Sequence, residues 1–265
     1  AKADELIMFS IFILMRIFRL IRKIEWPDSW KRTAKAATEL LYPSTCPVCG
    51  KISQGVCEDC RKELKFVEQP VCYRCGKPVG SMEQEFCPDC QKTHHSYRQG
   101  CAMLLYEGKV KEVIHKIKYS NKREYLETFA RMLARYGEKN VQMWQPEVLV
   151  PIPMYPKKKK LRGYNQAEIL AGYLGEYWNL PVDTELLKKV RDTGAQKELD
   201  RATRRKNLLE AFAAEMESTY QRVLLVDDVY TTGSTVDAAA ESLKRAGISD
   251  IFYIAICIGH GDMIY

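Results

Sequence analysis

The second half of the chain alternates between short apolar runs and stretches in which apolar residues recur every three or four positions. The runs predict buried strands, and the longer period predicts amphipathic helices. Strand–helix alternation favours an α/β fold, a mostly parallel sheet flanked by helices. The predicted strands are Glu147–Ile152, Arg222–Val226 and Ile251–Ile258, and the predicted helices are Val110–Lys118, Glu124–Arg135, Asn165–Trp178 and Thr235–Ala246.

An apolar segment near the start of the chain lies outside this pattern. Between residues 6 and 20 all but three residues are apolar. The run is shorter than the roughly 20 residues that span a bilayer, and no basic stretch of the kind found in export signals precedes it. Arg16, Arg19 and Lys23 share one helical face, so a helix here would pack against protein or lie on a membrane surface. We treat residues 1–40 as a segment of unknown role.

The overall composition is that of an ordinary globular protein. Hydrophobic residues make up 46% and charged residues 28% of the 265 positions, which excludes the disordered, collagen-like and polytopic membrane classes. The formal net charge is +7, but metal-bound thiolates would offset part of it, so charge says little about partners. We expect a cytoplasmic protein, with peripheral membrane contact through residues 6–20 as the alternative.

The ten cysteines are the one unusual feature of the composition, and eight of them form four C-x-x-C pairs. A C-x-x-C turn directs two thiolates to one point, and two turns complete a tetrahedral zinc site without an open position for catalysis. We therefore predict two structural zinc ions, with sequential pairing preferred over crossed pairing and thiol redox chemistry as the competing interpretation. The predicted ligands are Cys46, Cys49, Cys57, Cys60, Cys72, Cys75, Cys87 and Cys90.

Two acids, Asp227 and Asp228, follow the predicted strand Arg222–Val226, and a Thr-Thr-Gly-Ser-Thr loop then opens a helix. Such a loop offers backbone N–H groups and hydroxyls to a phosphate, and Gly233 lets the backbone approach a ligand closely. The acids lie at the carboxyl end of a strand, where α/β sheets bind ligands, and would bind ribose hydroxyls or Mg²⁺. The loop residues are Thr231, Thr232, Gly233, Ser234 and Thr235.

The stretch Val223–Thr235 closely resembles the phosphoribosyl-pyrophosphate (PRPP) signature of type I phosphoribosyltransferases. With its other motifs the chain resembles the ComF family, competence-associated proteins that join a double zinc ribbon to a phosphoribosyltransferase domain. The likeness runs from about Leu40 to Ile258. The motifs are Leu41-Tyr42-Pro43 ahead of the cysteine pairs, Lys118-Tyr119, Val150-Pro151-Ile152-Pro153, Arg162-Gly163-Tyr164-Asn165-Gln166, and the spacing Gln196…Leu199…Arg204…Asn207…Ala211-Phe212.

The resemblance implies a double zinc ribbon over residues 41–95 and a type I phosphoribosyltransferase fold over residues 96–265. It implies PRPP as the ligand, bound with Mg²⁺, and a diphosphate loop near Pro151–Tyr155. The run of like charge at Lys157–Lys160, which follows, is by itself typical of a solvated basic turn. A flexible loop over 191–206 would close over the site. By resemblance, Asp227 and Asp228 bind the ribose, and residues 231–235 bind the 5-phosphate. Arg162 and Arg204 face the diphosphate, Lys118 contacts a phosphate or the diphosphate, and Gln166 also contacts PRPP.

Two functions remain open at this point. One is a transferase that passes the phosphoribosyl group to an unidentified nitrogen acceptor. The other is a competence factor that binds PRPP or a related ligand without turnover. Such a factor would use its zinc ribbons and basic loops to contact single-stranded DNA or proteins of the competence machinery.

Overall fold

The structure, a computed structural model, describes residues 43–192, 210–216 and 218–259. Of these, residues 46–51 and all those from 55 onward belong to one compact unit. The described residues outside it are 43–45 and 52–54, where Thr45 and Ile52 form an isolated antiparallel bridge. Within the described ranges no helix combines the length and the apolar character that crossing a membrane requires. The apolar run at 6–20 lies outside the described residues.

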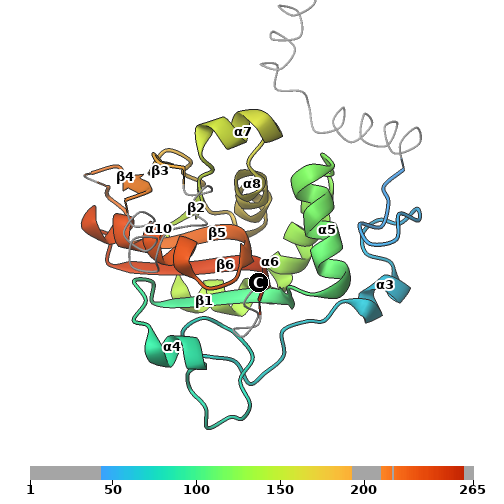
Figure 1. Ribbon diagram of the computed structural model, residues 1–265, viewed down its shortest axis with the longest axis horizontal. Helices are drawn as coiled ribbons and strands as arrows, with labels where there is room; N and C mark the ends of the chain where they lie inside the picture. The colour runs from blue at the N-terminus through green and yellow to red at the C-terminus, as the bar shows by residue number, and fades with distance from the viewer. Residues whose placement is uncertain (1–42, 193–209, 217, 260–265) are drawn as a thin grey trace, which may run out of the picture. The chain divides into compact units, whose positions relative to one another are not determined.

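A four-stranded parallel sheet forms the centre of the unit (Figure 1). Its order is β1-β6-β5-β2, and all three strand pairings are parallel. The inner strands are almost continuously apolar and buried, as expected where a parallel sheet is covered on both faces. The α/β class with a parallel sheet flanked by helices is therefore confirmed. The strands are β1 (Gln99–Leu105), β2 (Val148–Pro151), β5 (Arg222–Tyr230) and β6 (Asp250–Ile258).

Alternating residues of β5 enter two separate cores, because successive side chains of a strand point to opposite faces. Leu224 and Val226 pack into the first core, together with residues of three helices. Val223 and Leu225 pack into the second core, which one long helix covers. The helices of the first core are α5 (Gly108–Tyr119), α6 (Tyr125–Trp144) and α8 (Gln166–Trp178), and that of the second is α10 (Ser234–Arg245).

The segment that carries the eight paired cysteines, which we call the cysteine-rich module, contributes to both cores of the same sheet. Cys46 and Cys60 belong to the first core, whereas Cys72 and Cys75 belong to the second. The two halves of the module thus reach opposite faces. The remaining elements are α3 (Glu58–Glu63) and α4 (Pro88–Lys92) in this module, α7 (Pro156–Arg162), and the antiparallel pair β3 (Leu187–Lys189) and β4 (Phe212–Ala214) beside α10.

The predicted strands and helices are confirmed, with instructive differences at their ends. β5 continues through both acids to Tyr230, because β6 pairs with it as far as Ile258. The stretch Lys157–Lys160, expected as a basic turn, lies in helix α7, which begins at Pro156, a residue whose fixed φ suits the first helical position. β1, β3 and β4 were not predicted, because each depends on a partner strand that is distant in the sequence.

Candidate functional site

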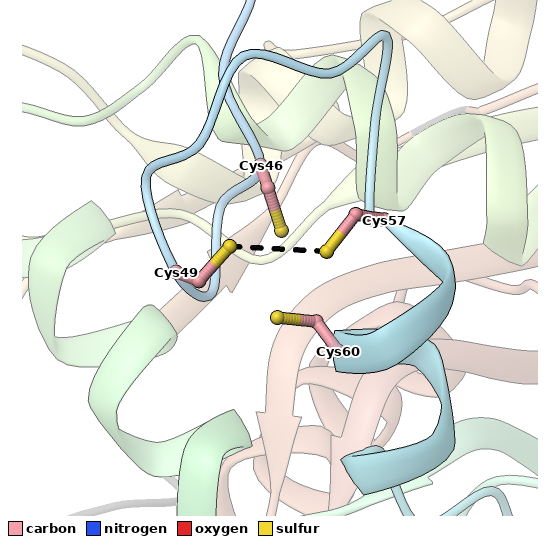
Figure 2. A group of neighbouring side chains, drawn as sticks. All are labelled: Cys46, Cys49, Cys57 and Cys60. Atoms are coloured by element: carbon pink, nitrogen blue, oxygen red, sulfur yellow. Dashed lines mark hydrogen bonds between the residues drawn. The ribbon is translucent and has the colours of Figure 1, made fainter.

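The eight predicted zinc ligands gather into two groups of four. The first is Cys46, Cys49, Cys57 and Cys60, whose sulfurs face a common centre in Figure 2. The second is Cys72, Cys75, Cys87 and Cys90. In each group all the Sγ atoms lie within 4.8 Å of one another. Sequential pairing is therefore what the structure has, and we call the groups the first and the second cysteine cluster.

Both clusters are built on the same backbone turn. In the first, the Cys46 N–H donates to the Lys51 carbonyl at 2.7 Å, and the Gly50 N–H donates back to the Cys46 carbonyl at 2.9 Å. In the second, Cys72 and Gly76 repeat these bonds at 2.7 and 2.9 Å. Both glycines have positive φ, +78° and +70°, which explains why glycine follows each leading pair.

The donor set of each cluster fits a structural zinc ion. Four crowded thiols cannot all ionise without a cation, and hydrogen bonds from Cys72 and Cys87 raise the pKa of Cys75 far above its usual value. Soft thiolates in a tetrahedral set select Zn²⁺ and leave no coordination position open. Cys101 differs, because it belongs to neither cluster and burial raises its pKa to about 12.

The acid pair lies where one edge of β5 loses its neighbour. β2 ends at Pro151, paired with Val226, so Asp227 and Asp228 extend beyond it while β6 continues along their other side. Asp228 is 2% exposed. Its two carboxylate oxygens contact side chains of different helices. Lys118 Nζ of α5 lies 2.7 Å from Oδ2, and Gln166 Nε2 of α8 donates to Oδ1 at 3.3 Å.

Local structure explains how Gln166 and its neighbours reach this edge. Asn165 caps α8 by accepting the Ala167 N–H at 3.1 Å and donates to the Ile152 carbonyl at 3.0 Å, which ties the helix start to the end of β2. Gln166 is the first residue of α8. Arg162 donates to the Gln166 side-chain oxygen at 2.7 Å. A continuous chain of polar contacts therefore joins Arg162, Gln166, Asp228 and Lys118.

The negative charges of Asp227 and Asp228 are not fully compensated by the neighbouring cation. Burial alone would lower the pKa of Lys118, but the Asp228 carboxylate outweighs burial and leaves this pKa above its ordinary value. The pKa of Asp227 is raised well above its ordinary range by burial and then by the charge of Asp228, against a smaller opposing effect of Lys118. One lysine thus compensates one of the two carboxylates. The second carboxylate favours binding of a further cation.

The loop after the acids turns into α10 within three residues. Gly233 precedes the helix with φ of +79°, and its carbonyl accepts the Asp237 N–H at 2.8 Å. The Thr232 and Ser234 hydroxyls lie 2.8 Å apart and both side chains are exposed. Thr231 is exposed and Thr235 half-buried. Exposed hydroxyls and the N–H groups of a helix start suit a phosphoryl group.

Most of the predicted site residues therefore lie on one connected edge of the sheet. Lys118, Arg162 and Gln166 converge on Asp228, and the loop 231–235 continues from the same strand. Arg204 and most of the 191–206 loop lie outside the described residues. Sequence reasoning missed Lys189 of β3, a half-buried lysine whose pKa is lowered by burial and by Lys158 and which feels the charge of Asp227. No motif marks it, because it stands in a basic run.

Known proteins resemble parts of this chain. Residues 37–91 match the family described as "Double zinc ribbon domain". Competence protein F of Haemophilus influenzae is 35% identical over 145 residues, which cover 52% of this chain and 63% of that protein. The chain thus spans less than two thirds of this relative's own length.

Other relatives show the same partial coverage. DNA utilization protein YhgH of Escherichia coli K12 is 28% identical over 57% of this chain and 68% of its own length. Competence protein ComFC of Streptococcus pneumoniae is 27% identical over 57% of this chain and 64% of its own. The crystal structure of a purine phosphoribosyltransferase from Pyrococcus horikoshii aligns at 14% identity with a TM-score of 0.30, over 52% of this chain and 90% of that one.

We predict two zinc ions per chain, one in each cluster. Metal analysis of the purified protein should give about two zinc, and either Cys49→Ser or Cys90→Ser should lower the content to about one. Cys101→Ala, a cysteine outside both clusters, is the control and should retain two. No zinc in the wild-type protein, or an unchanged content in the cluster variants, would contradict the assignment.

We predict that Asp227 makes the ligand-free protein less stable as the pH rises. Because its pKa is raised in the folded state, its contribution to the free energy of unfolding is fully present below the ordinary carboxyl pKa of about 3.9 and is lost as the pH climbs through the raised value. Asp227→Asn should therefore melt a few degrees above wild type at pH 7. Thermal unfolding between pH 4 and pH 8 measures this. The exposed Glu138→Gln should follow wild type, and parallel curves for Asp227→Asn would refute the prediction.

Proposed function

We propose that the chain is a member of the ComF family, because the proteins it resembles are named competence and DNA utilization proteins, and that it binds PRPP with Mg²⁺ at the carboxyl edge of its sheet. One observation carries the proposal: the acid pair leads directly into the loop 231–235 and the start of α10. PRPP is a ribose with a 5-phosphate on one side and a 1-diphosphate on the other. Each part has a matching group at this edge.

The 5-phosphate would accept from the N–H groups and hydroxyls of the loop, with Gly233 allowing close approach. Asp227 and Asp228 would bind the ribose hydroxyls. Asp227, whose burial and acidic neighbour penalise its charge, also supplies the hard oxygen donor that Mg²⁺ prefers. When bound, the metal would neutralise the diphosphate.

Lys118 and Arg162 would face the diphosphate. Lys118 already lies 2.7 Å from Asp228 and Arg162 is held by Gln166, so both cations are in place before the ligand arrives. Preformed cations stabilise negative charge at little reorganisation cost. Arg204 and the loop 191–206 would complete the site by closing over it and excluding water.

As a transferase, the protein would break the bond from ribose C1 to the diphosphate oxygen and form a bond from C1 to a nitrogen acceptor. The electron pair of the broken bond leaves on the diphosphate, and the acceptor nitrogen loses its proton. The positive charge that develops on the ribose requires fixed geometry and a stabilised leaving group. The acid pair and the two cations would provide these. The alternative within the same site is binding of PRPP without turnover.

We predict that PRPP with Mg²⁺ binds the wild-type protein and that Asp228→Asn binds it at least about tenfold more weakly, because the variant loses a carboxylate that contacts ribose. Titration calorimetry measures the affinity. Zinc content and thermal unfolding confirm that the variant is folded, and Glu112→Gln, an exposed acid on α5, is the matched control. Equal affinity of Asp228→Asn and wild type would reject the acid assignment. Diphosphate release with any of a panel of nitrogen acceptors would favour the transferase, and binding without release the alternative.

The surface around the second cysteine cluster supports a second proposed activity, which is contact with single-stranded DNA. Tyr73 there is 57% exposed, and Arg74, Phe86 and Lys92 line an adjacent hollow of about 400 Å³. Exposed rings that stack on bases, interleaved with cations that contact phosphates, are how proteins bind single strands without sequence preference. DNA-utilization relatives support the idea.

We predict that a labelled oligonucleotide binds with an affinity that falls steeply as salt rises, and that Lys92→Gln lowers the slope of log affinity against log salt by about one unit or less. Fluorescence anisotropy over a salt series measures both. Salt-independent binding, or none, would remove DNA from the proposal. We also propose the division into residues 1–40, 41–95 and 96–265, competence-machinery proteins as partners, and a cytoplasmic location with or without membrane contact through residues 6–20.

A further inference from the structure

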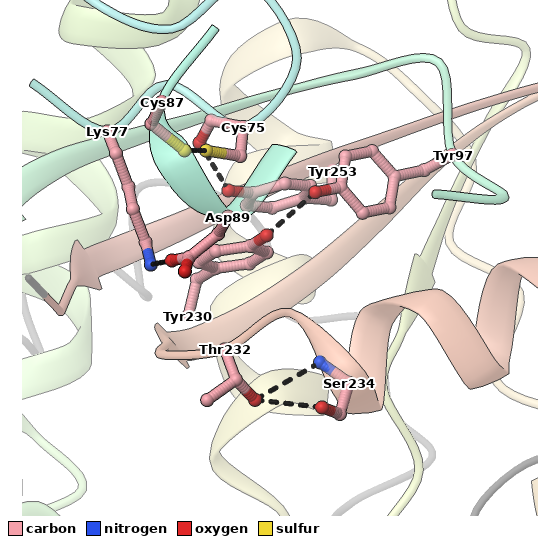
Figure 3. A network of polar contacts seen from close by, with 9 residues as sticks. All are labelled: Cys75, Lys77, Cys87, Asp89, Tyr97, Tyr230, Thr232, Ser234 and Tyr253. Carbon is pink, nitrogen blue, oxygen red and sulfur yellow. Dashed lines mark hydrogen bonds and ion pairs between the residues drawn. The ribbon is translucent and has the colours of Figure 1, made fainter. Parts of the chain in front are cut away.

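Three buried tyrosines fill the space between the second cysteine cluster and the loop 231–235 (Figure 3). Tyr230 of β5 and Tyr253 of β6 stack almost parallel, with centroids 4.6 Å apart and planes at 3°. Tyr97 meets both rings edge-on, at 6.3 and 5.1 Å. Burial raises the pKa of all three phenols, so they keep their protons and can donate.

The stack is anchored to the cluster at one end. The Tyr253 hydroxyl donates to the carbonyl of Cys75, a predicted zinc ligand, at 2.6 Å. The ring lies so close to β1 that a Cβ on Gly100 would be 1.8 Å from it. Gly100 in turn donates its N–H to the Arg74 carbonyl at 2.8 Å. The Tyr253 side chain is therefore held between β1 and the backbone of the second cluster.

At its other end the stack lies against the loop 231–235. The Tyr230 hydroxyl is so close to Gly233 that a Cβ there would lie 2.3 Å from its oxygen. The same hydroxyl is 2.7 Å from that of Tyr97. Gly233 is the residue with φ of +79° that turns the chain into α10. A shift of the Tyr230 ring would therefore meet the loop backbone at its tightest point.

The segment after the cluster holds the start of α10 as well. His95 stacks on Tyr97 at 4.9 Å, and its Nδ1 lies 3.6 Å from the Asp237 carboxylate in the first turn of α10. The Ser96 N–H donates to that carboxylate at 2.5 Å. Tyr230 therefore contacts the loop at Gly233, and the segment that leads out of the second cluster holds the first turn of α10 through Asp237.

We propose that Tyr97, Tyr230 and Tyr253 couple the second cysteine cluster to the phosphate loop. A metal ion in the cluster would fix the position of the Cys75 carbonyl. Through the hydrogen bond to Tyr253 and the stacked rings, that carbonyl restrains Tyr230 and hence Gly233. The tyrosines are positioning residues that touch no ligand themselves. The significance of the loop rests on the proposed PRPP binding, but the coupling itself is a property of the chain. The first cluster packs into the other core and provides the natural control.

Amide hydrogen exchange at the loop, followed at the Asp237 N–H that donates to the Gly233 carbonyl, tests the coupling in the full-length protein without any ligand. Tyr253→Phe keeps the stack and removes only the bond to Cys75. Tyr230→Phe removes the hydroxyl next to Gly233 together with its hydrogen bond to Tyr97. Each should speed exchange in the loop by about tenfold, because a local opening becomes easier. Tyr177→Phe, an exposed tyrosine on α8, should leave it unchanged. Loop exchange equal to wild type in both stack variants would overturn the proposal.

Loss of metal from one cluster or the other gives a second, sharper comparison. Cys90→Ser, which disables the second cluster, should speed loop exchange as the tyrosine variants do. Cys49→Ser, which disables the first, should not. Equal effects of the two variants would mean that zinc supports the fold generally rather than the loop through the tyrosines, and would overturn the proposal.

Coupling between two sites must act in both directions. In Cys49→Ser protein, which retains only the second cluster, PRPP with Mg²⁺ should slow the loss of zinc to a chelator about fivefold or more. Adding Tyr253→Phe should abolish that protection, which a merely structural role would not do. If calorimetry shows no PRPP binding at all, the proposed function fails while the exchange experiments still decide the coupling. Binding without protection of zinc would overturn the coupling alone.

Discussion

The ion pair of a buried carboxylate, at the carboxyl end of β5, is the most demanding interaction in this protein. Asp228 is 2% exposed, and an unpaired ion in such a place costs several kcal/mol. Lys118 and Gln166 meet its two oxygens from different helices. The positions of α5 and α8 on the first face of the sheet are therefore constrained by one charge as well as by apolar packing.

This constraint gives the cysteine-rich module a structural role beyond its own turns. Residues of the first cluster pack into the core that carries α5 and α6, and Lys116 of α5 donates to the Val48 carbonyl at 3.4 Å. Residues of the second cluster pack on the other face with Tyr230 and Tyr253. Each cluster thus packs into the core on one face of the sheet that carries the acid pair. A segment that the sequence presents as a separate small module is, in the structure, part of the support of the site.

What could be read from the sequence is what depends on near neighbours. The C-x-x-C spacing predicted both clusters, because a short turn determines where two sulfurs point. The helices α5, α8 and α10 followed from periodicity and stops such as Gly247. The acids of β5 were expected just after the strand, because the apolar run ends at Val226, whereas pairing with β6 continues the strand through both acids.

What could not be read depends on residues far apart in the chain. Tyr97, Tyr230 and Tyr253 come from three segments, and no local pattern relates them. Gly100 weakened the strand signal of β1, although the Tyr253 ring requires a glycine there. Lys189 reaches the neighbourhood of Asp227 through β3, a three-residue strand formed only by pairing with β4.

The same arrangement explains why the site needs so much support. Asp227 beside Asp228 stores unfavourable charge in the folded chain, since one lysine compensates one carboxylate, and the loop beyond them turns sharply at a glycine. Each feature costs stability in the ligand-free protein. A ligand that brings a cation and a phosphoryl group would relieve both, and whatever binds only the folded state stabilises it. The two cysteine clusters and the two cores around a short stretch of β5 would give such a site its support.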